Sequence, residues 1–439
     1  MNPKKFFEKA AEQGITPFEV RYESQSALRI KVFNDELENY EIANDSSLSC
    51  RGIYEGKTGS FKSDRCDNKV VDMALDAIKA SSKSGLEGNP EFFINKGLAY
   101  KRVYGFSKTI ENVTSEDLIA CARKISSGVR AKDTRITNCE VNMTKSSCVD
   151  EMYNSNGLSL KSRSNYISFY VQINIKDGDD IESAFKDEIC SDWQTLDIDA
   201  FIDSAVKDAQ SRLGASTVPS GKYDVILSRS IVPLLLRPLL SQLSAFDVKQ
   251  HLSLFEGKVG QEVLSKKLTV IENPHVKGAF ASSFDSEGMP TVKKTLISSG
   301  VLETYLYDLE TAKENSVQST GNASSVNGNI RPSLGYIEVR KGRLDLDEMA
   351  HKIGKGLYIT SLEGIGTGLN EQSGDYSLQA EGYLIEDGKI TRPVTLITVA
   401  GNLLKDFNKI ICVGSDIKIT SEAVATPSIA VRKLSVSGS

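Results

Sequence analysis

Histidine is scarce in this chain of 439 residues, which contains three: His251, His275 and His351. A zinc hydrolase holds its ion with imidazoles that stand close together on one helical face, as in HExxH or the longer HExxxH. No two of these histidines are three to five residues apart. The nearest arrangement to a ligand pair is Asp247-x-x-x-His251, which would share one face of a helix, and such pairs are usually surface contacts. The sequence therefore predicts no metal site on this chain.

Disulfides and zinc ribbons are also disfavoured. The seven cysteines form no CxxC pair and leave an odd one over, which suits reduced, packed thiols. Cys412 lies within the apolar run 410–413. We expect it to be a buried strand thiol rather than an activated nucleophile.

Long apolar runs and basic clusters are lacking. The charged segment 1–14 has no continuous apolar core of the kind found in signal peptides, and the most apolar stretch, 231–240, is interrupted by Arg237 and two prolines. We therefore expect a soluble, cytoplasmic protein with no membrane span. Lys and Arg total 53 against 58 Asp and Glu, a formal charge of −5, and basic residues cluster only in pairs. Direct binding to nucleic acid is unfavourable, because it needs a concentrated basic face.

Nucleophile and phosphate motifs are missing too. The chain has no GxSxG elbow, no GxxxxGK[ST] loop and no GxGxxG turn. Among the acidic residues, Asp285-x-Glu287-Gly288 stands out as a turn with paired carboxylates. The pattern favours a structural turn that caps a hairpin over 291–307. The alternative is a self-sufficient hydrolase that uses Asp285 and Glu287.

The sequence does contain a succession of hairpins and amphipathic helices, which predicts an α+β fold of two or three domains. Residues 1–90 form the first α+β unit and residues 91–218 the second, and together they make one N-terminal lobe. The Thr114-x-x-Asp117 capping box marks the start of one helix. Further helices are expected at 3–13, 69–80 and 198–213, and short strands at 18–22, 28–33, 37–42, 47–54, 134–142, 147–153, 158–163 and 166–175.

The break Pro219-Ser220-Gly221 marks the clearest domain boundary. Residues 222–439 are predicted to form a strand-rich domain with antiparallel hairpins, a helix over 231–246 kinked or restarted at Pro238, a short helix over 345–353 and a closing strand over 428–436. The hairpins at 296–302 and 384–390 echo each other. An internal duplication and coincidence both explain the echo.

The segment 364–388 gathers polar, small and turn-forming residues directly ahead of a strand and an Asp387-Gly388 hairpin turn. Such residues bond locally to the backbone and tolerate positive φ, so the loop can hold a fixed shape with backbone amides directed at a ligand. A simple turn before a strand is the alternative. The candidate substrate-binding residues are Asn370, Ser373, Gly374, Asp375 and Ser377.

Several motifs, in order along nearly the whole chain, resemble the TldD/PmbA family, whose members include DNA gyrase modulator-type proteins. They are Leu48-Ser49-Cys50-Arg51-Gly52, Asp285-x-Glu287-Gly288-x-Pro290, Ser319-Thr320-Gly321-Asn322-Ala323, Gly368-x-Asn370-x-x-Ser373-Gly374-Asp375-x-Ser377 and Ala400-Gly401-Asn402-Leu403. The resemblance implies a two-domain α+β protein and a zinc peptidase made of one TldD chain and one PmbA (TldE) chain, which acts on unfolded peptides. The family's zinc site is an HExxxH helix in the TldD chain, with a cysteine near its C-terminus.

This sequence departs from that zinc site. Residues 231–263, where the helix should fall, contain no His-Glu pair, although Cys412 falls near the place of the family's cysteine. We therefore predict the metal-free PmbA/TldE-like subunit, with no catalytic residue of its own. Its expected partners are a TldD-like chain that carries HExxxH and the zinc, and a peptide substrate; alone, the chain is expected to form a homodimer. The alternative from another class is a non-enzymatic regulator that binds gyrase or a toxin-antitoxin component.

Overall fold

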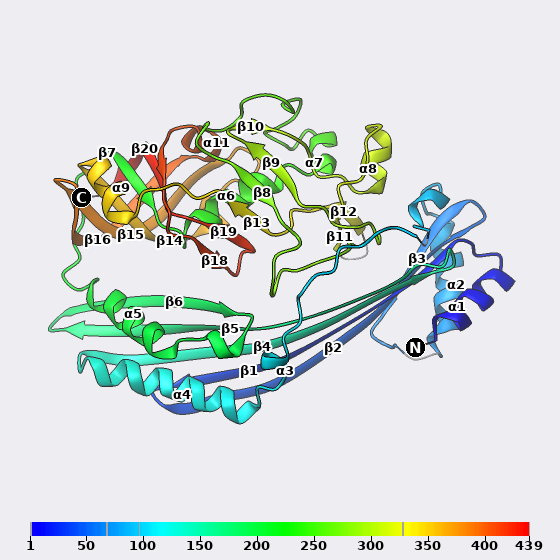
Figure 1. Ribbon diagram of the computed structural model, residues 1–439, viewed down its shortest axis with the longest axis horizontal. Coiled ribbons are helices and arrows are strands. Elements are labelled where there is room, and N and C mark those ends of the chain that lie inside the picture. The colour runs from blue at the N-terminus through cyan, green and yellow to red at the C-terminus, as the bar shows by residue number, and fades with distance from the viewer. Residues whose placement is uncertain (1, 67–68, 96, 327–328, 439) are drawn as a thin grey trace.

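The N-terminal half is built on one large antiparallel sheet with the strand order β3-β2-β1-β4-β5-β6 (Figure 1). The computed structural model describes residues 2–66, 69–95, 97–326 and 329–438. The sheet draws strands from both 1–90 and 91–218. Its strands are β1 (Phe18–Phe33), β2 (Glu36–Tyr54), β3 (Lys57–Ser63), β4 (Ile136–Asn154), β5 (Ser159–Asp177) and β6 (Asp180–Cys190).

Four of these strands are about two to three times as long as the strands that the sequence predicts. Each pair of short strands expected in β1, β2, β4 and β5 is one continuous strand of 16 to 19 residues. The sequence predicted a break because the middle of each strand is polar. That prediction was wrong. In the sheet these polar stretches lie side by side: Glu23–Ser26 pairs with residues 44–47 on one side and 147–150 on the other. Backbone pairing with the neighbouring strands keeps the chain extended where the apolar alternation lapses.

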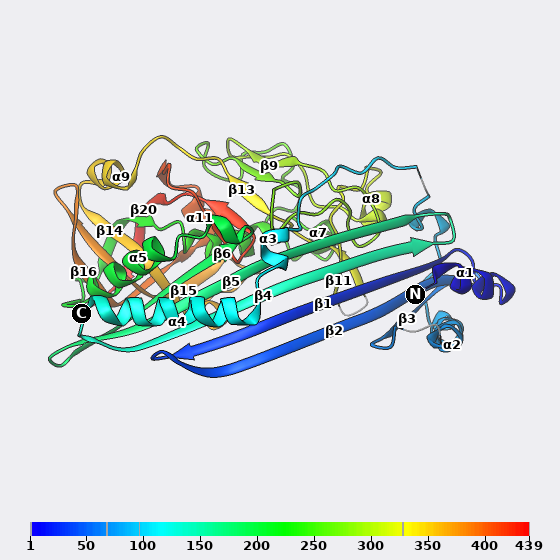
Figure 2. The same ribbon diagram turned by 60° about the horizontal axis from the view of Figure 1, so that its bottom comes forward.

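Helices cover the two ends of this sheet and leave its middle to the polar stretches (Figure 2). At one end α4 and α5 pack on Ile30, Val141 and Phe169, and at the other end α1 and α2 pack on Phe18 and Leu48. The capping box at Thr114 and Asp117 forms as predicted. The helical bounds are α1 (Pro3–Glu12), α2 (Val70–Ser82), α3 (Lys108–Glu111), α4 (Ser115–Lys132) and α5 (Ile198–Gln210), with single 3₁₀ turns η1 (Pro90–Phe92) and η2 (Trp193–Thr195).

The C-terminal half contains two six-stranded sheets and a small hairpin. One sheet has the order β16-β15-β14-β7-β20-β17 and the other β10-β9-β8-β13-β19-β18. The first comprises β7 (Gly221–Leu227), β14 (Gly356–Glu363), β15 (Asp375–Glu386), β16 (Lys389–Asn402), β17 (Ile410–Val413) and β20 (Ile429–Ser437). The second comprises β8 (Val270–Glu272), β9 (Lys294–Ser298), β10 (Val301–Leu302), β13 (Ile337–Val339), β18 (Lys418–Thr420) and β19 (Val424–Thr426), while β11 (Ala323–Val326) pairs with β12 (Asn329–Pro332).

The apolar helix α6 (Val232–Ser241) is the centre of this half. Its side chains join the core shared by both sheets, and Val232, Leu236, Leu239 and Leu240 are fully buried. Burying one such side chain contributes about 2 kcal/mol. The predicted helix over 231–246 continues through Pro238 but ends at Ser241, and a separate short helix starts at Ala245. The other helices are α7 (Ala245–Lys249), α8 (Leu309–Glu314), α9 (Leu346–Ile353), α10 (Ile365–Gly368) and α11 (Leu403–Phe407).

Both echoing hairpins form, with residues of positive φ at Ser299-Gly300 and Asp387-Gly388. They lie in different sheets, and an internal duplication and coincidence both still explain the echo. No helix in the described ranges is long and apolar enough to cross a membrane.

Candidate functional site

The polar loop between α10 and β15 is held in a fixed shape by its own residues. The Asn370 Oδ1 atom accepts hydrogen bonds from the backbone amides of Gln372 and Ser373, each 3.0 Å long. The Gly374 amide donates to the Asn370 carbonyl at 2.8 Å, and Gly374 has φ +74°. These bonds are the local side-chain to backbone contacts that Asn and Ser favour in turns.

A second segment ties this loop down from the opposite strand. The Asn402 side-chain amide donates to the Asp375 carboxylate and to the Ser373 carbonyl, each at 2.8 Å. Asn402 also caps α11 by accepting from the Lys405 amide, and the Leu403 amide donates to the Gly374 carbonyl. The Asn402 hydrogen bond, and then that of Ser373, lowers the pKa of Asp375. Asp375 is therefore an exposed carboxylate whose orientation is fixed.

Buried polar groups support the loop from below. The Tyr376 hydroxyl donates to Asp406 Oδ2 at 3.0 Å, and the same oxygen accepts from the backbone amide of Asn402 at 2.8 Å. Burial raises the pKa of Tyr376 well above its ordinary value, so the hydroxyl stays a donor. Gly401 admits this contact, because a Cβ atom there would lie 2.1 Å from Asp406 Oδ2.

The loop also lies against the segment that follows α6. The Gln242 side-chain amide donates to the Glu371 carbonyl, and its Oε1 atom accepts from the Leu254 amide at 2.8 Å. Leu254 in turn lies next to Gly374, 3.2 Å from where a Cβ atom would stand. The candidate loop therefore adjoins the stretch 231–263, in which the family resemblance places a metal-binding helix.

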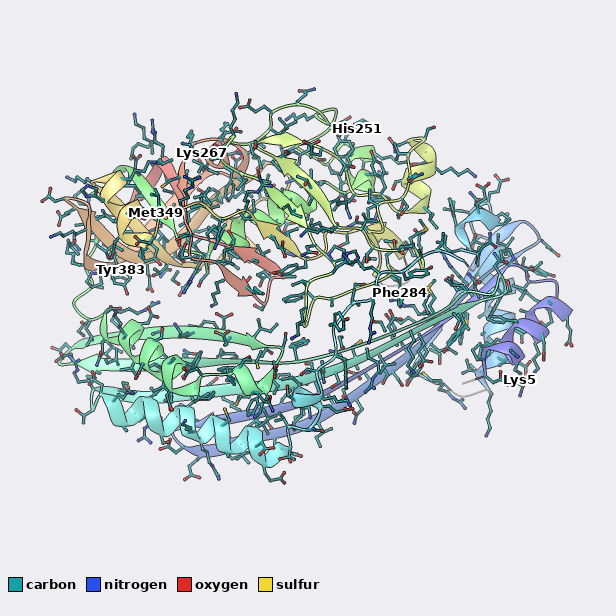
Figure 3. The ribbon with its side chains drawn as sticks, viewed as in Figure 1. Lys5, His251, Lys267, Phe284, Met349 and Tyr383 are labelled. Atoms are coloured by element: carbon teal, nitrogen blue, oxygen red, sulfur yellow. The ribbon has the colours of Figure 1, made fainter. Side chains whose placement is uncertain are left out.

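The residues of that stretch do not fit a zinc ion. Its one histidine, His251, has φ +59°, lies beyond the end of α7 and pairs with Glu256 at 2.8 Å, while its side chain is 79% exposed. The predicted helical face shared with Asp247 is therefore wrong. Figure 3 shows His251 at the outer margin of the C-terminal half, well apart from Met349.

Cys412 packs with Met349 in one apolar cluster of buried side chains, so it cannot share an ion with His251. It is buried in β17, as predicted, and burial raises the pKa of its thiol. Within the described ranges no three His, Cys, Asp or Glu side chains gather in a group that could hold a metal.

The structure brings four of the five candidate residues into one turn. Asn370 and Asp375 are exposed, Ser373 is half-buried and Gly374 is buried. Ser377 is exposed one step further on, in β15 opposite Ala400. The candidate list missed Asn402, Asp406 and Gln242. The 400–403 motif pointed to Asn402, whereas no pattern in the sequence pointed to Gln242.

The acidic pair at 285–287 is a structural element. Asp285 accepts from the backbone amides of Glu287, Met289 and Ala323 at 2.9 to 3.0 Å, so it joins its own turn to β11 and does not cap the hairpin over 291–307. Glu287 accepts from the Leu309 amide at 2.8 Å. Burial raises the pKa of Asp285 to about 6 and that of Glu287 to about 8. Both acids are buried and engaged with backbone amides, which leaves the hydrolase alternative without an accessible acid-base pair.

Comparison with known proteins assigns three long segments of the chain to one family. Residues 18–82 match the PmbA/TldA metallopeptidase domain 1, residues 108–213 match the central domain, and residues 220–438 match the C-terminal domain. The PmbA metalloprotease homologue of Buchnera aphidicola is 26% identical over 96% of this chain and 93% of its own length. The metalloprotease PmbA of Escherichia coli O157:H7 is 25% identical over 96% and 92%.

The fold of this chain matches solved structures over nearly its full length. A Thermotoga maritima protein, named as a proposed modulator of a DNA gyrase, superposes with a TM-score of 0.91 at 27% identity over 99% of both chains. TldE from Thermococcus kodakarensis has the same fold, with a TM-score of 0.87 at 19% identity over 100% of both chains. These matches cover all three parts of the molecule in the order of the sequence motifs, and the chain belongs to the PmbA/TldD family of metallopeptidase-type proteins.

Proposed function

We propose that this chain is the metal-free, PmbA/TldE-like subunit of a cytoplasmic two-chain zinc peptidase that acts on unfolded peptides. The partner is a TldD-like chain that carries HExxxH, and it supplies both the zinc and the general base. This chain closes the substrate channel and presents polar groups to the peptide. By itself it forms a homodimer through the surface that meets the partner.

The observation that carries the proposal is the separation of the potential metal donors. His251 is an exposed surface residue paired with Glu256, and Cys412 is packed among apolar side chains of another cluster. A catalytic zinc needs about three protein ligands around one point. The relatives named as metalloproteases support a peptidase, so the zinc of the proposed complex belongs on the other subunit.

The polar loop supports the proposed role in substrate contact. Asn370, Asp375 and Ser377 are exposed, while Asn402 and Gln242 hold the loop backbone from two sides. A rigid loop loses little conformational freedom when a peptide binds, which makes each contact more effective. These residues position the peptide and take no part in its chemistry.

The test is reconstitution with an HExxxH-containing family member. The purified chain alone should contain no stoichiometric zinc by elemental analysis and should cleave no fluorogenic peptide. Mixing should give a heterodimer by light scattering, one zinc per complex and chelator-sensitive cleavage. As a control, a partner whose HExxxH glutamate is replaced by glutamine should assemble but not cleave. Tightly held zinc and chelator-sensitive activity in this chain alone would contradict the proposal.

The regulatory alternative rests on the name of the Thermotoga relative. If the chain acted as a regulator, immobilised protein would capture gyrase or a toxin-antitoxin component as readily as a family partner. We expect capture of the HExxxH chain and none of the other proteins.

A further inference from the structure

A cleft of about 640 Å³ lies between the two halves of the molecule, away from the polar loop. One wall is formed by β6 and α5, and the other by the segments 276–280 and 417–419 with Arg229. The volume is within the range of sites that bind small ligands.

Two contacts fix the walls of this cleft. On one side Lys418 of β18 donates to the carboxylate of Asp187 at 2.7 Å and to its carbonyl at 3.3 Å, so β18 lies against the edge of β6. Figure 1 shows β18 on the side of the C-terminal half that faces β6. On the other side the Ala279 amide donates to the Ser191 hydroxyl at 3.2 Å, and a Cβ atom on Gly278 would stand 2.3 Å from that hydroxyl. The walls are therefore set before any ligand enters, and the space suits a compact ligand on the α5 face of β6.

An unpaired carboxylate lines the cleft on this face. Glu188 is two positions from Lys186, whose ammonium donates to the Ser204 hydroxyl of α5 at 2.6 Å, and residues two positions apart in a strand share one face. Within the described ranges the Glu188 carboxylate forms no hydrogen bond or ion pair. Burial raises the pKa of this carboxyl, although nearby cations act in the opposite direction. A positive group of a ligand would therefore be favourably placed beside it.

The two other acids of the lining already have partners. Asp187 is the counter-ion of Lys418, and the Asp197 carboxylate accepts from the Ala200 amide at 3.0 Å as the N-cap of α5. Glu188 is therefore the lining acid that is left for a positive group of a ligand.

Positive charge without a counter-ion stands nearby. Arg229 follows β7 and donates to the Asp416 carbonyl at 3.4 Å, and in the part of the chain that the structure describes neither Arg229 nor Lys277 forms an ion pair. Arg229 is close enough to Glu188 to lower its pKa, yet the two side chains are not in ion-pair contact. A zwitterion can bridge such a gap, because each of its ends meets an opposite charge.

Apolar side chains line the space around these charges. Ile417 and Ile419 are 44% and 41% exposed, and both line the cleft. Phe280 lines it as well, and its ring stacks on Tyr336 with the centroids 5.5 Å apart. These side chains offer apolar contact to a ligand side chain of similar character.

We propose that the cleft binds a small zwitterion with an apolar side chain. Its ammonium lies at Glu188, its carboxylate at Arg229 and Lys277, and its side chain against the segment 417–419. Free amino acids and short peptides with free ends share this chemistry. The inference goes beyond the proposed function, because the cleft lies away from the polar loop and binding needs neither zinc nor a partner chain.

Binding is measured by isothermal titration calorimetry on the full isolated chain, with L-leucine and the dipeptide Leu-Leu as probes. N-acetylation of a probe removes its ammonium and amidation removes its carboxylate, and each change should weaken binding at least about tenfold. Tighter binding of leucine identifies the ligand as a free amino acid, and tighter binding of Leu-Leu identifies it as a short peptide. Failure of both probes to bind at millimolar concentration would overturn the proposal.

Variants assign each end of the probe to its partner. Glu188→Gln should weaken binding of the free probe at least about tenfold and leave binding of the N-acetylated probe unchanged, because that probe has no ammonium to lose. Arg229→Gln should likewise weaken binding of the free probe and spare the amidated one. The controls Glu8→Gln and Lys5→Gln remove the same charges from exposed residues of α1 and should leave every affinity unchanged.

Melting temperatures verify that each variant is folded, and the capped probes test the proposal on the unaltered chain. Equal affinity for capped and free probes would overturn the proposal. So would cleft variants that bind the free probe as tightly as the controls do. Both results hold whether or not the chain assembles with a partner, so they are independent of the proposed peptidase.

Discussion

The contact between the two halves of the molecule contains a buried glutamate that should respond to pH in an unusual direction. Glu287 is 3% exposed and faces the Arg51 side chain, which is itself paired with Glu19 at 2.7 Å. Burial raises the pKa of Glu287 from 4.5 to about 8, even though Arg51 acts in the opposite direction. Near neutral pH the folded chain therefore holds a proton on this carboxyl.

The size of the effect follows from linkage. Between pH 4.5 and 8 the folded chain keeps a proton that the unfolded chain has released, so raising the pH favours unfolding. At pH 7, about 2.5 units above the unfolded value, the cost at 1.36 kcal/mol per unit is about 3 kcal/mol. Glu287→Gln keeps the shape and the oxygen that accepts from the Leu309 amide, and it removes this cost. The variant should match the wild type near pH 4.5 and exceed its stability by up to about 3 kcal/mol at pH 7.

The assay is the urea unfolding midpoint of both proteins at half-unit steps from pH 4.5 to 8.5. Asp285→Asn is the matched control at the neighbouring acid. It replaces one of the two oxygens that together accept from three backbone amides by an NH2 donor, and should cost about 1–3 kcal/mol. Wild-type and Glu287→Gln midpoints that stay parallel across this range would refute the argument that Glu287 is protonated by burial.

Three further predictions concern the loop and the thiols. Asp375→Ala should change the free energy of unfolding by less than about 0.5 kcal/mol, since the carboxylate is exposed. It should nevertheless lower the turnover of the reconstituted complex about a hundredfold. A lower denaturation midpoint with unchanged turnover would contradict the assignment of the loop to substrate binding. Asn402→Ala removes the cap of α11 and both contacts to the loop, and should lower stability by about 1–2 kcal/mol in denaturation. Exposed Cys148 should react with Ellman's reagent in the folded chain and buried Cys412 after unfolding; a fast phase that persists in Cys148→Ser but vanishes in Cys412→Ser would contradict this.

The features that the sequence predicted are those whose cause is local. The Thr114 and Asp117 capping box needs residues three positions apart, and the Asp387-Gly388 hairpin turn needs two residues that accept positive φ, as both do here. Cys412 was predicted as a buried strand thiol because its immediate neighbours are apolar. In each case the determining contacts lie within a few positions in the chain.

The features that the sequence missed depend on remote partners. The continuity of β1 through Glu23–Ser26 comes from β2 and β4 on either side, more than a hundred positions away in the case of β4. The anchoring of the loop by Gln242 and Asn402 joins segments from three elements. His251 was expected on a helical face, but α7 ends before it and the chain turns at positive φ.

The long strands matter because the C-terminal half contacts the sheet near both ends. At one end Arg212 of the segment after α5 pairs with Glu381 at 2.6 Å. Nearer the middle of the sheet, Ser191 follows β6 and holds the 278–279 turn. At the other end the Tyr100 hydroxyl donates to the Gly288 carbonyl, beside buried Met152 and Leu158. A sheet broken into short strands could bend between these contacts. Continuous strands resist that bending, so the contacts at the two ends of the sheet keep a fixed relation to each other.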